Sequence, residues 1–245
     1  MEIVEGDMMR ISPFYQRILA WLVSLIVPVV LVLAAVRLLM NPWYVEFEYR
    51  TPSFPADPYG FTLEERLKYS KIAIAYLVND ADISFLGDLR FPAGQQAPDF
   101  SCQFMEDCTR LYNDRELKHM LDVKLVVRGA MRVLLAGVLL LAGLGVWARQ
   151  GGWWEAYRKG WVRGGKLTLA LIAAIVLFVL VSFGVIFVFF HQVFFESGTW
   201  TFYYSDTLIR LFPERFWRDT FLAVGVISAA LGALAMALFG DRSKK

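Results

Sequence analysis

The sequence predicts an all-α integral membrane protein with four transmembrane helices and a small extracytoplasmic α/β cap between spans 1 and 2. The 245-residue chain is 57% hydrophobic and 16% aromatic, with a mean hydropathy of +0.47, so it is more apolar than an ordinary soluble domain. It contains four long apolar runs, and many of its basic residues lie in the segments that connect or flank them. The net charge of +2 gives no reason to expect a nucleic-acid partner.

Each apolar run approaches the length of about 20 residues that a helix needs to cross a bilayer. The first run is longer than the core of a cleaved signal peptide and has no small-residue cleavage site after it, so we expect it to be retained as an anchor. The second run begins beside arginines whose side chains can extend toward the membrane surface. The expected spans within this single membrane domain are 18–40, 125–148, 167–190 and 220–240.

Positive charge beside the spans predicts their orientation. The connection 149–166 contains five basic residues and one acidic residue, and the C-terminal tail adds three more basic residues. Because short cytoplasmic loops are enriched in Lys and Arg, we expect this connection and both termini in the cytoplasm. Segment 41–124 then forms an extracytoplasmic cap, and segment 191–219 forms an extracytoplasmic re-entry loop.

The first part of the cap carries a strand pattern. The stretch YVEFEYR, residues 44–50, alternates apolar and acidic side chains, which is typical of a half-buried strand and is the reason for expecting an α/β cap. The proline-rich stretch TPSFPADPYG that follows predicts a loop. Residues 79–112 are rich in Gly, Pro, Asp and Gln, and they show no pattern of regular structure.

Two helix starts are marked by capping boxes. Thr62 is followed three residues later by Glu65, which predicts a helix over 62–78. Asn113 is followed in the same way by Glu116. We expect the second helix to continue through the membrane as the second span.

Both cysteines of the chain, Cys102 and Cys108, lie in the cap. Their extracytoplasmic location favours a disulfide that closes a small loop, because thiols outside the cytoplasm tend to oxidise. Two free thiols are the alternative. No histidine stands at metal-ligand spacing from them, so we expect no metal site.

The two histidines, His119 and His191, are the candidate catalytic residues. His119 shortly precedes the second span and His191 follows the third, so the expected topology places both at the outer boundary of the membrane. Imidazole has an unperturbed pKa of about 6.5 and can take and return a proton near neutral pH. Each ring alone is also consistent with an inert helix end at the interface. Motifs of zinc metalloproteases, serine hydrolases and P-loop proteins are absent from the sequence.

Four further residues are candidates for orienting the histidines or lining the site. Asp122 follows His119 by three residues, so it either orients that ring from the same helix face or pairs with a neighbouring cation. Glu116, Trp200 and Asp206 are the others. Each has a structural alternative, which is helix capping for the two carboxylates and anchoring at the membrane interface for the tryptophan.

Two stretches of the chain carry a resemblance to a known family. ELKHMLDVK, residues 116–124, is similar to an E-x-x-H-M-x-D-V-K segment of the lipoprotein intramolecular transacylase (Lit) family of bacterial integral membrane proteins. FHQVFFESGTWTFYYSDTLIRLFP, residues 190–213, resembles a second family segment with F-H-x-x-F-F, G-x-W-T-F and D-T-L-I-x-L-F-P. The chain departs from the family in ESGT at 196–199, where Pro often precedes and Asn often follows the glycine, and in its cysteine pair.

The resemblance implies an acyltransferase that acts at the outer leaflet of the bacterial cell membrane. Its substrate would be a diacylated lipoprotein or lipopeptide, whose sn-2 acyl chain moves to the α-amino group of the N-terminal cysteine and leaves a lyso-form lipoprotein. We expect histidine acid/base catalysis with no acyl-enzyme and no cofactor. His119 is favoured as the base because of Asp122, and His191 would stabilise the oxyanion or carry the proton. Membrane lipids are the other expected partners.

Two other functions are consistent with the same residues. Two histidines at similar depth on antiparallel helices can ligate a haem and make the protein an electron carrier. A non-enzymatic sensor whose cap recognises lipid or lipopeptide is the second alternative. A coloured purified protein would indicate the haem, whereas a sensor would keep its function without either imidazole.

Overall fold

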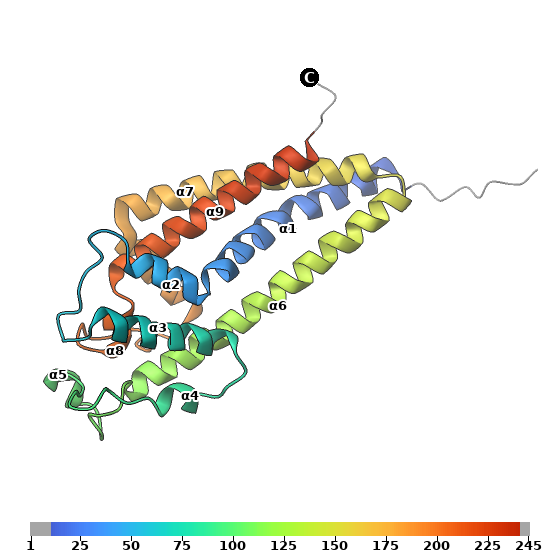
Figure 1. Ribbon diagram of the computed structural model, residues 1–245. Coiled ribbons are helices and arrows are strands. Elements are labelled where there is room, and N and C mark those ends of the chain that lie inside the picture. The colour runs from blue at the N-terminus through green and yellow to red at the C-terminus, as the bar shows by residue number, and fades with distance from the viewer. Residues whose placement is uncertain (1–10, 241–245) are drawn as a thin grey trace, which may run out of the picture. The chain divides into compact units, whose positions relative to one another are not determined.

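The computed structural model describes residues 11–240, which form nine helices and no strand beyond one isolated bridge between Arg90 and Arg110. The chain divides into two compact units. Among the described residues, the membrane unit comprises 11–36, 131–177 and 223–240, and the cap unit comprises 37–130 and 178–222. The helices (Figure 1) are α1 (Pro13–Leu39), α2 (Pro42–Tyr49), α3 (Leu63–Val78), α4 (Ser84–Gly87), α5 (Asp99–Cys102), α6 (Asp114–Gln150), α7 (Trp154–Phe194), α8 (Thr207–Leu211) and α9 (Glu214–Phe239).

Four of these helices, α1, α6, α7 and α9, are long and apolar enough to cross a membrane, which confirms the expected number of spans. With 37 residues, α6 is roughly 55 Å long at 1.5 Å per residue, so it exceeds the hydrocarbon core of about 30 Å. Its first turns have the polar sequence DRELKH and carry His119. Histidine 119 therefore precedes the apolar segment of its helix.

Small residues bring the helices of the membrane unit together. A Cβ atom on Gly160 of α7 would lie 2.8 Å from the carbonyl oxygen of Ala20 and 2.8 Å from Cβ of Val23, both on α1. One turn later, a Cβ on Gly164 would lie 2.6 Å from Cβ of Val27. Glycines spaced by four residues permit such close packing of helices in lipid, where the hydrophobic effect does not drive association.

The predicted strand over residues 44–50 is wrong, because residues 44–49 lie in helix α2 and Arg50 is the C-cap of that helix. The side chain of Asn41 accepts a hydrogen bond from the backbone N–H of Trp43 (3.3 Å) and caps the helix, and Pro42 occupies the first turn, where proline is favoured. The alternating pattern misleads because Phe47 is exposed while the helix buries positions 44, 45, 48 and 49. The cap is therefore helical and not α/β.

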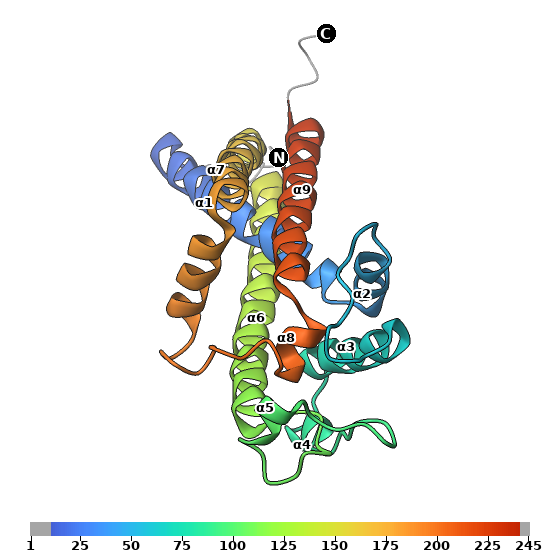
Figure 2. The ribbon, with the colours of Figure 1, turned by 90° about the vertical axis from the view of Figure 1, so that its left-hand side faces the viewer.

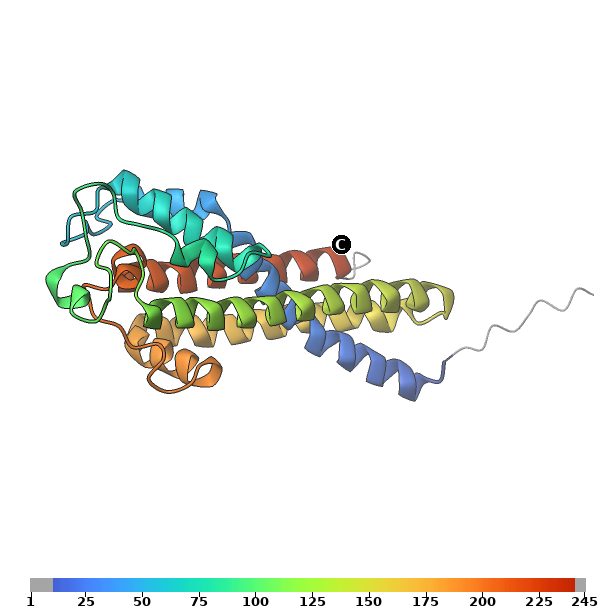
Figure 3. The same cartoon turned by 90° about the horizontal axis from the view of Figure 1, so that it is seen from below.

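Helices α2 and α3 lie side by side within the cap unit (Figure 3). The hydroxyl groups of Tyr49 on α2 and Ser70 on α3 are hydrogen-bonded at 2.7 Å. The expected capping box of α3 is confirmed, since Thr62 Oγ1 accepts from the backbone N–H of Glu65 and Glu65 Oε2 accepts from the backbone N–H of Thr62. Within 79–112, where no regular structure was expected, only the short helices α4 and α5 form.

Helix α7 bends at Ser182, whose backbone is non-helical (φ −156°, ψ 75°) (Figure 1). After the bend, the last turns of α7 run in a different direction from the first part of the helix, and these turns carry His191. After α7 the chain passes through residues 195–206 to α8, which lies beside the first part of α6 (Figure 2). The segment after α7 and the start of α6 thus come together in the cap unit.

Candidate active site

The cap unit brings the two histidines together, although they are far apart in the sequence. The ring centroids of His119 on α6 and His191 on α7 are 6.1 Å apart, and the ring planes are inclined by only 20°. His119 is buried, with 6% of its surface exposed, and His191 is half-buried. The two imidazoles are thus close enough to contact one small group at the same time.

His191 is held by its own helix. Its Nδ1 lies 2.7 Å from the carbonyl oxygen of Phe187, one turn earlier on α7. Because a carbonyl oxygen only accepts hydrogen bonds, Nδ1 carries the hydrogen and donates it. In the neutral ring Nε2 is then the free acceptor, which is the arrangement a general base requires.

His119 is held by aromatic packing. Its ring centroid lies 4.9 Å from that of Phe195 and 5.3 Å from that of Phe202. Its Nδ1 is buried and has no hydrogen-bond partner among the described residues. Asp122 is half-buried and makes no hydrogen bond with His119 in the described structure, so the expected orientation of the ring by this carboxylate is not observed.

Trp200 lies next to His191, with 4.9 Å between the ring centroids. Its indole Nε1 is buried and has no acceptor among residues 11–240. An indole N–H can only donate a hydrogen bond. The tryptophan therefore presents an unused donor beside the histidine pair.

Asp206 is a buried hub in the cap unit and does not contact either histidine. Its carboxylate, 1% exposed, accepts hydrogen bonds from the Ser101 hydroxyl (2.9 Å), Asn113 Nδ2 (3.3 Å), Arg115 Nη2 (2.9 Å) and the backbone N–H of Tyr203 (2.9 Å). It stands at the N-cap position of α8, but its side chain does not cap that helix. Its oxygens instead join three separate segments of the chain.

Arg115 connects this hub to the histidines. Its guanidinium lies 5.5 Å from the ring centroid of Phe202, the same ring that packs on His119. Arg115 is also one helical turn before His119. The path from Asp206 through Arg115 and Phe202 therefore reaches the imidazole through direct contacts.

Glu116 has the capping role that its spacing predicted, together with a second one. Its Oε2 accepts from the backbone N–H of Asn113 (2.8 Å), and Asn113 Oδ1 accepts from the backbone N–H of Glu116 (2.9 Å). Its Oε1 accepts from the backbone N–H of Leu208 at the start of α8 (2.6 Å). Both oxygens of this buried carboxylate are thus used to hold the starts of two helices.

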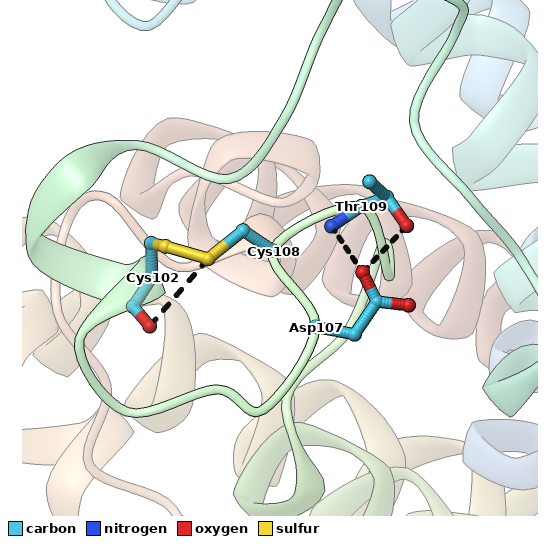
Figure 4. The surroundings of a disulfide bond; sticks show 4 residues. All are labelled: Cys102, Asp107, Cys108 and Thr109. Atoms are coloured by element: carbon cyan, nitrogen blue, oxygen red, sulfur yellow. Dashed lines mark hydrogen bonds between the residues drawn. A yellow bond between two sulfur atoms is a disulfide. The ribbon is translucent and has the colours of Figure 1, made fainter.

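The structure pairs Cys102 with Cys108, so the disulfide is present (Figure 4). The bond closes a loop in which Asp107 accepts hydrogen bonds from the backbone N–H and the hydroxyl of Thr109. Ser101, the residue before the first cysteine, is the one that donates to Asp206. The disulfide loop is thereby tied to the hub.

Sequence reasoning missed the aromatic rings around the histidines. Phe187 and Phe195 lie four residues before and after His191, so helical spacing alone would have placed them beside it. Phe202 lies outside helix α7, so no helical spacing places it beside either histidine. Lys124 is also buried, and its ammonium group donates to Asn79 Oδ1 at 3.0 Å.

No group of three or more His, Cys, Asp and Glu side chains lies close enough to hold a metal ion within residues 11–240. The histidine pair and the neighbouring Trp200 bring two imidazoles and one indole N–H together. Proton transfer and hydrogen-bond donation are two tasks that these groups can perform.

A family model described as "Lipoprotein intramolecular transacylase Lit" matches residues 21–217, a range that includes both histidines. An uncharacterized protein of Aquifex aeolicus (strain VF5) is 27% identical over 228 residues, which cover 90% of this chain and 93% of that protein. Two structures of the membrane integral lipoprotein intramolecular transacylase Lit of Bacillus cereus share the fold. One has a TM-score of 0.72 at 20% identity over 93% of this chain and 95% of the other. The other, a histidine-to-alanine variant of the same Bacillus cereus protein, has a TM-score of 0.61 at 17% identity and covers 92% of this chain and 94% of its own.

Proposed function

Because the chain belongs to the lipoprotein intramolecular transacylase (Lit) family, we propose that it is a membrane acyltransferase that moves an acyl chain within a diacylated lipoprotein. The sn-2 chain leaves the glycerol and joins the α-amino group of the N-terminal cysteine, which gives the lyso-form lipoprotein. The observation that carries the proposal is the 6.1 Å pairing of His119 and His191 inside the region that the family model matches.

The reaction requires two proton transfers and no external reagent. The amine nitrogen attacks the ester carbonyl, forms the new C–N bond and gives up one proton. The bond between the acyl carbon and the glycerol oxygen then breaks, and that oxygen takes up a proton. A single base that becomes an acid in the second step serves both transfers, so neither a cofactor nor an acyl-enzyme is needed.

His191 is the better supported base. Its Nδ1–H donates to the carbonyl oxygen of Phe187, which fixes the ring and leaves Nε2 ready to accept the amine proton. His119 would be favoured as the base if Asp122 oriented its ring, but no hydrogen bond joins the two side chains in the described part of the chain. The hydrogen bond of His191 to Phe187 therefore supports His191 as the base.

The developing oxyanion needs donors that are in place before the reaction. Trp200 Nε1–H is buried, lies beside His191 and has no acceptor among the described residues. His119 supplies a second N–H from the opposite ring. Donors without partners in the free enzyme gain their hydrogen bonds when the negative charge forms, and this gain lowers the barrier.

The site must also fold the substrate. The amine reaches the ester by closing a medium ring, which is entropically unfavourable unless the reacting atoms are held together. The first turns of α6 are polar and the segment after His119 is more apolar, so we place the polypeptide of the substrate at the start of the helix and its acyl chains along the apolar segment. A cavity of about 180 Å³ lies beside Phe104 and residues 113–115, at the start of α6.

The proposed topology places both termini and the connection 149–166 in the cytoplasm and the histidines at the outer leaflet. It is supported by the basic residues of the connection and by the disulfide of the cap, which forms in an oxidising compartment. Single cysteines introduced at Lys159 and at Lys68, in a variant without the native pair, test the topology. An impermeant thiol reagent on whole cells should label the Lys68 position and not the Lys159 position; the reverse pattern contradicts it.

The experiment for the reaction is mass spectrometry of a diacylated lipopeptide incubated with the purified protein in detergent. We expect an unchanged total mass and a fragment in which one acyl chain is attached to the N-terminal nitrogen. His191→Ala should lower the rate by about 10²- to 10⁴-fold, the usual contribution of a general base. Lys118→Ala, an exposed neighbour of His119, is the matched control and should retain full activity.

A substrate that keeps both chains on glycerol, when incubated with folded wild-type protein, would contradict the reaction. Retained transfer by a double His119→Ala and His191→Ala variant would contradict the role of the pair. Circular dichroism and the unfolding temperature show whether each variant is folded. A loss of activity with an unchanged unfolding temperature is the expected result.

A further inference from the structure

A second cavity lies entirely within the membrane unit, and none of its lining residues belongs to the unit that holds the histidines. Its volume is about 630 Å³. It is bounded by the start of α1, the start of α7 and the end of α9. This size falls within the range of roughly 300–1,000 Å³ that is typical of ligand pockets.

The glycine contacts between α1 and α7 explain where the cavity lies. Around Gly160 the two helices touch at Ala20 and Val23, so no space remains between them there. The lining includes the long side chains of Arg17 on α1 and Arg163 on α7. The cavity lies among these side chains, and Phe239 of α9 forms part of its apolar wall.

The lining is strongly cationic. It contains Arg17, Arg158, Lys159 and Arg163 against the single acidic residue Glu155, which gives a formal charge of +3 from four cations and one anion. Arg17 forms no ion pair with the described residues. Glu155 is shared between Arg158 (3.8 Å) and Lys159 (3.4 Å), so it cannot neutralise the whole cluster.

Other contacts hold part of this cluster in position. Arg158 Nε donates to the carbonyl oxygen of Phe239 (3.1 Å), and its Nη2 donates to that of Gly240. The guanidinium of Arg163 lies 4.4 Å from the ring centroid of Trp21. Positively charged groups are therefore fixed around a cavity that is also partly apolar.

We propose that this cavity binds the headgroup of an anionic phospholipid from the leaflet that faces this end of the membrane unit. The phosphate takes the place among Arg17, Lys159 and Arg163, and the glycerol and first methylene groups contact the apolar wall beside Phe239. Trp21, 58% exposed on α1, belongs to the residue type that gathers at the level of lipid headgroups. Basic pockets between transmembrane helices are suited to such headgroups because cations attract the phosphate while the helices contact the chains.

The test uses the full chain in neutral detergent, stripped of lipid and mixed with phosphatidylglycerol, phosphatidylcholine or inorganic phosphate. Native mass spectrometry counts bound lipid, and the unfolding temperature reports stabilisation. We expect retention of phosphatidylglycerol and a higher unfolding temperature with this lipid alone. An equal response to phosphatidylcholine, or the same stabilisation by inorganic phosphate, would overturn the proposal.

The variant Arg17→Gln with Lys159→Gln removes two exposed cations of the cavity and leaves the packed glycines unchanged. Because each cation near an anionic lipid surface contributes about fivefold in affinity, we expect binding about 25-fold weaker. Arg149→Gln with Lys166→Gln removes the same charge outside the cavity and should bind normally. Equal binding by both double variants would contradict the assignment, and neither variant alters the residues proposed for acyl transfer.

Discussion

The two units of the chain are stabilised by different interactions. In the membrane unit, helices meet at glycines such as Gly160 and Gly164, where the backbones approach closely. In the cap unit, charged groups are buried, among them the ion pair of Arg210 and Asp57, whose side chains are 2% and 0% exposed. Helices in lipid depend on close packing, whereas a cap of short helices and long connections needs polar contacts that hold distant segments together. Substitutions in the two units should therefore lower the stability by different mechanisms.

Arg210→Met should have the largest effect, because it leaves the Asp57 carboxylate buried without its partner. Breaking a buried ion pair costs about 3–5 kcal/mol. Denaturant unfolding in micelles measures the loss. Arg128→Met is the matched control, since its pair with Asp80 is exposed and such pairs contribute about 0–1 kcal/mol. Equal losses in the two variants would show that the buried pair has no special role.

Gly160→Val should lower the stability of the membrane unit by about 3 kcal/mol, the upper end of the usual cost of overpacking. The added Cβ would lie 2.8 Å from the backbone oxygen of Ala20, which cannot move aside as a side chain can. Gly143→Val on α6 is the control, because a Cβ there meets nothing within 4 Å. If the two variants unfold at the same temperature, helix packing at Gly160 does not limit stability.

Loss of the disulfide should have an intermediate effect. Cys102→Ser with Cys108→Ser opens a loop with a sequence separation of 6, which costs about 2 kcal/mol in the chain-entropy model. Ser101 then holds Asp206 less firmly, so we also expect slower transfer. Reductant should change the unfolding temperature of the wild type and leave that of the variant unchanged. A wild type that is insensitive to complete reduction would contradict the role of the loop.

Glu48 should give an effect of a different kind, visible as a dependence of stability on pH. Burial, with a further contribution from Asp219, raises its pKa from 4.5 to about 7, against the opposing charge of Arg215. The folded state therefore keeps this proton over an interval in which the unfolded state has released it, so stability falls as pH rises from 4.5 to 7. Glu48→Gln should reduce this slope. Glu46→Gln serves as the control, because the hydrogen bond from Lys71 lowers the pKa of Glu46.

Much of the fold was predictable because its signals are local. The apolar runs and the capping boxes of Thr62 and Asn113 lie within one segment each, and the structure contains the corresponding helices. The prediction for residues 44–50 was wrong because a stretch of seven residues fits both a strand pattern and a helix pattern. The capping signal of Asn41 before Pro42 would have favoured the helix.

The two histidines could be predicted from the sequence, whereas the contacts around them could not. His119 and His191 could be singled out because they are the two imidazoles of the chain and the span order places them on one side. The contacts around them could not be predicted, since three of the four hydrogen bonds that Asp206 accepts come from residues 91 to 105 positions away. Such pairings depend on tertiary packing, and a single sequence contains no period that announces them.

The shared use of Glu116 determines when the site can be completed during synthesis. Its carboxylate holds the start of the helix that carries His119, but one of its two backbone partners, Leu208, lies 92 residues later. A ribosome must therefore have translated the chain through the start of α8 before this contact can form. Nascent chains that end before α8 lack the contact, so the order of translation itself delays assembly of the His119 environment until α9 is being made.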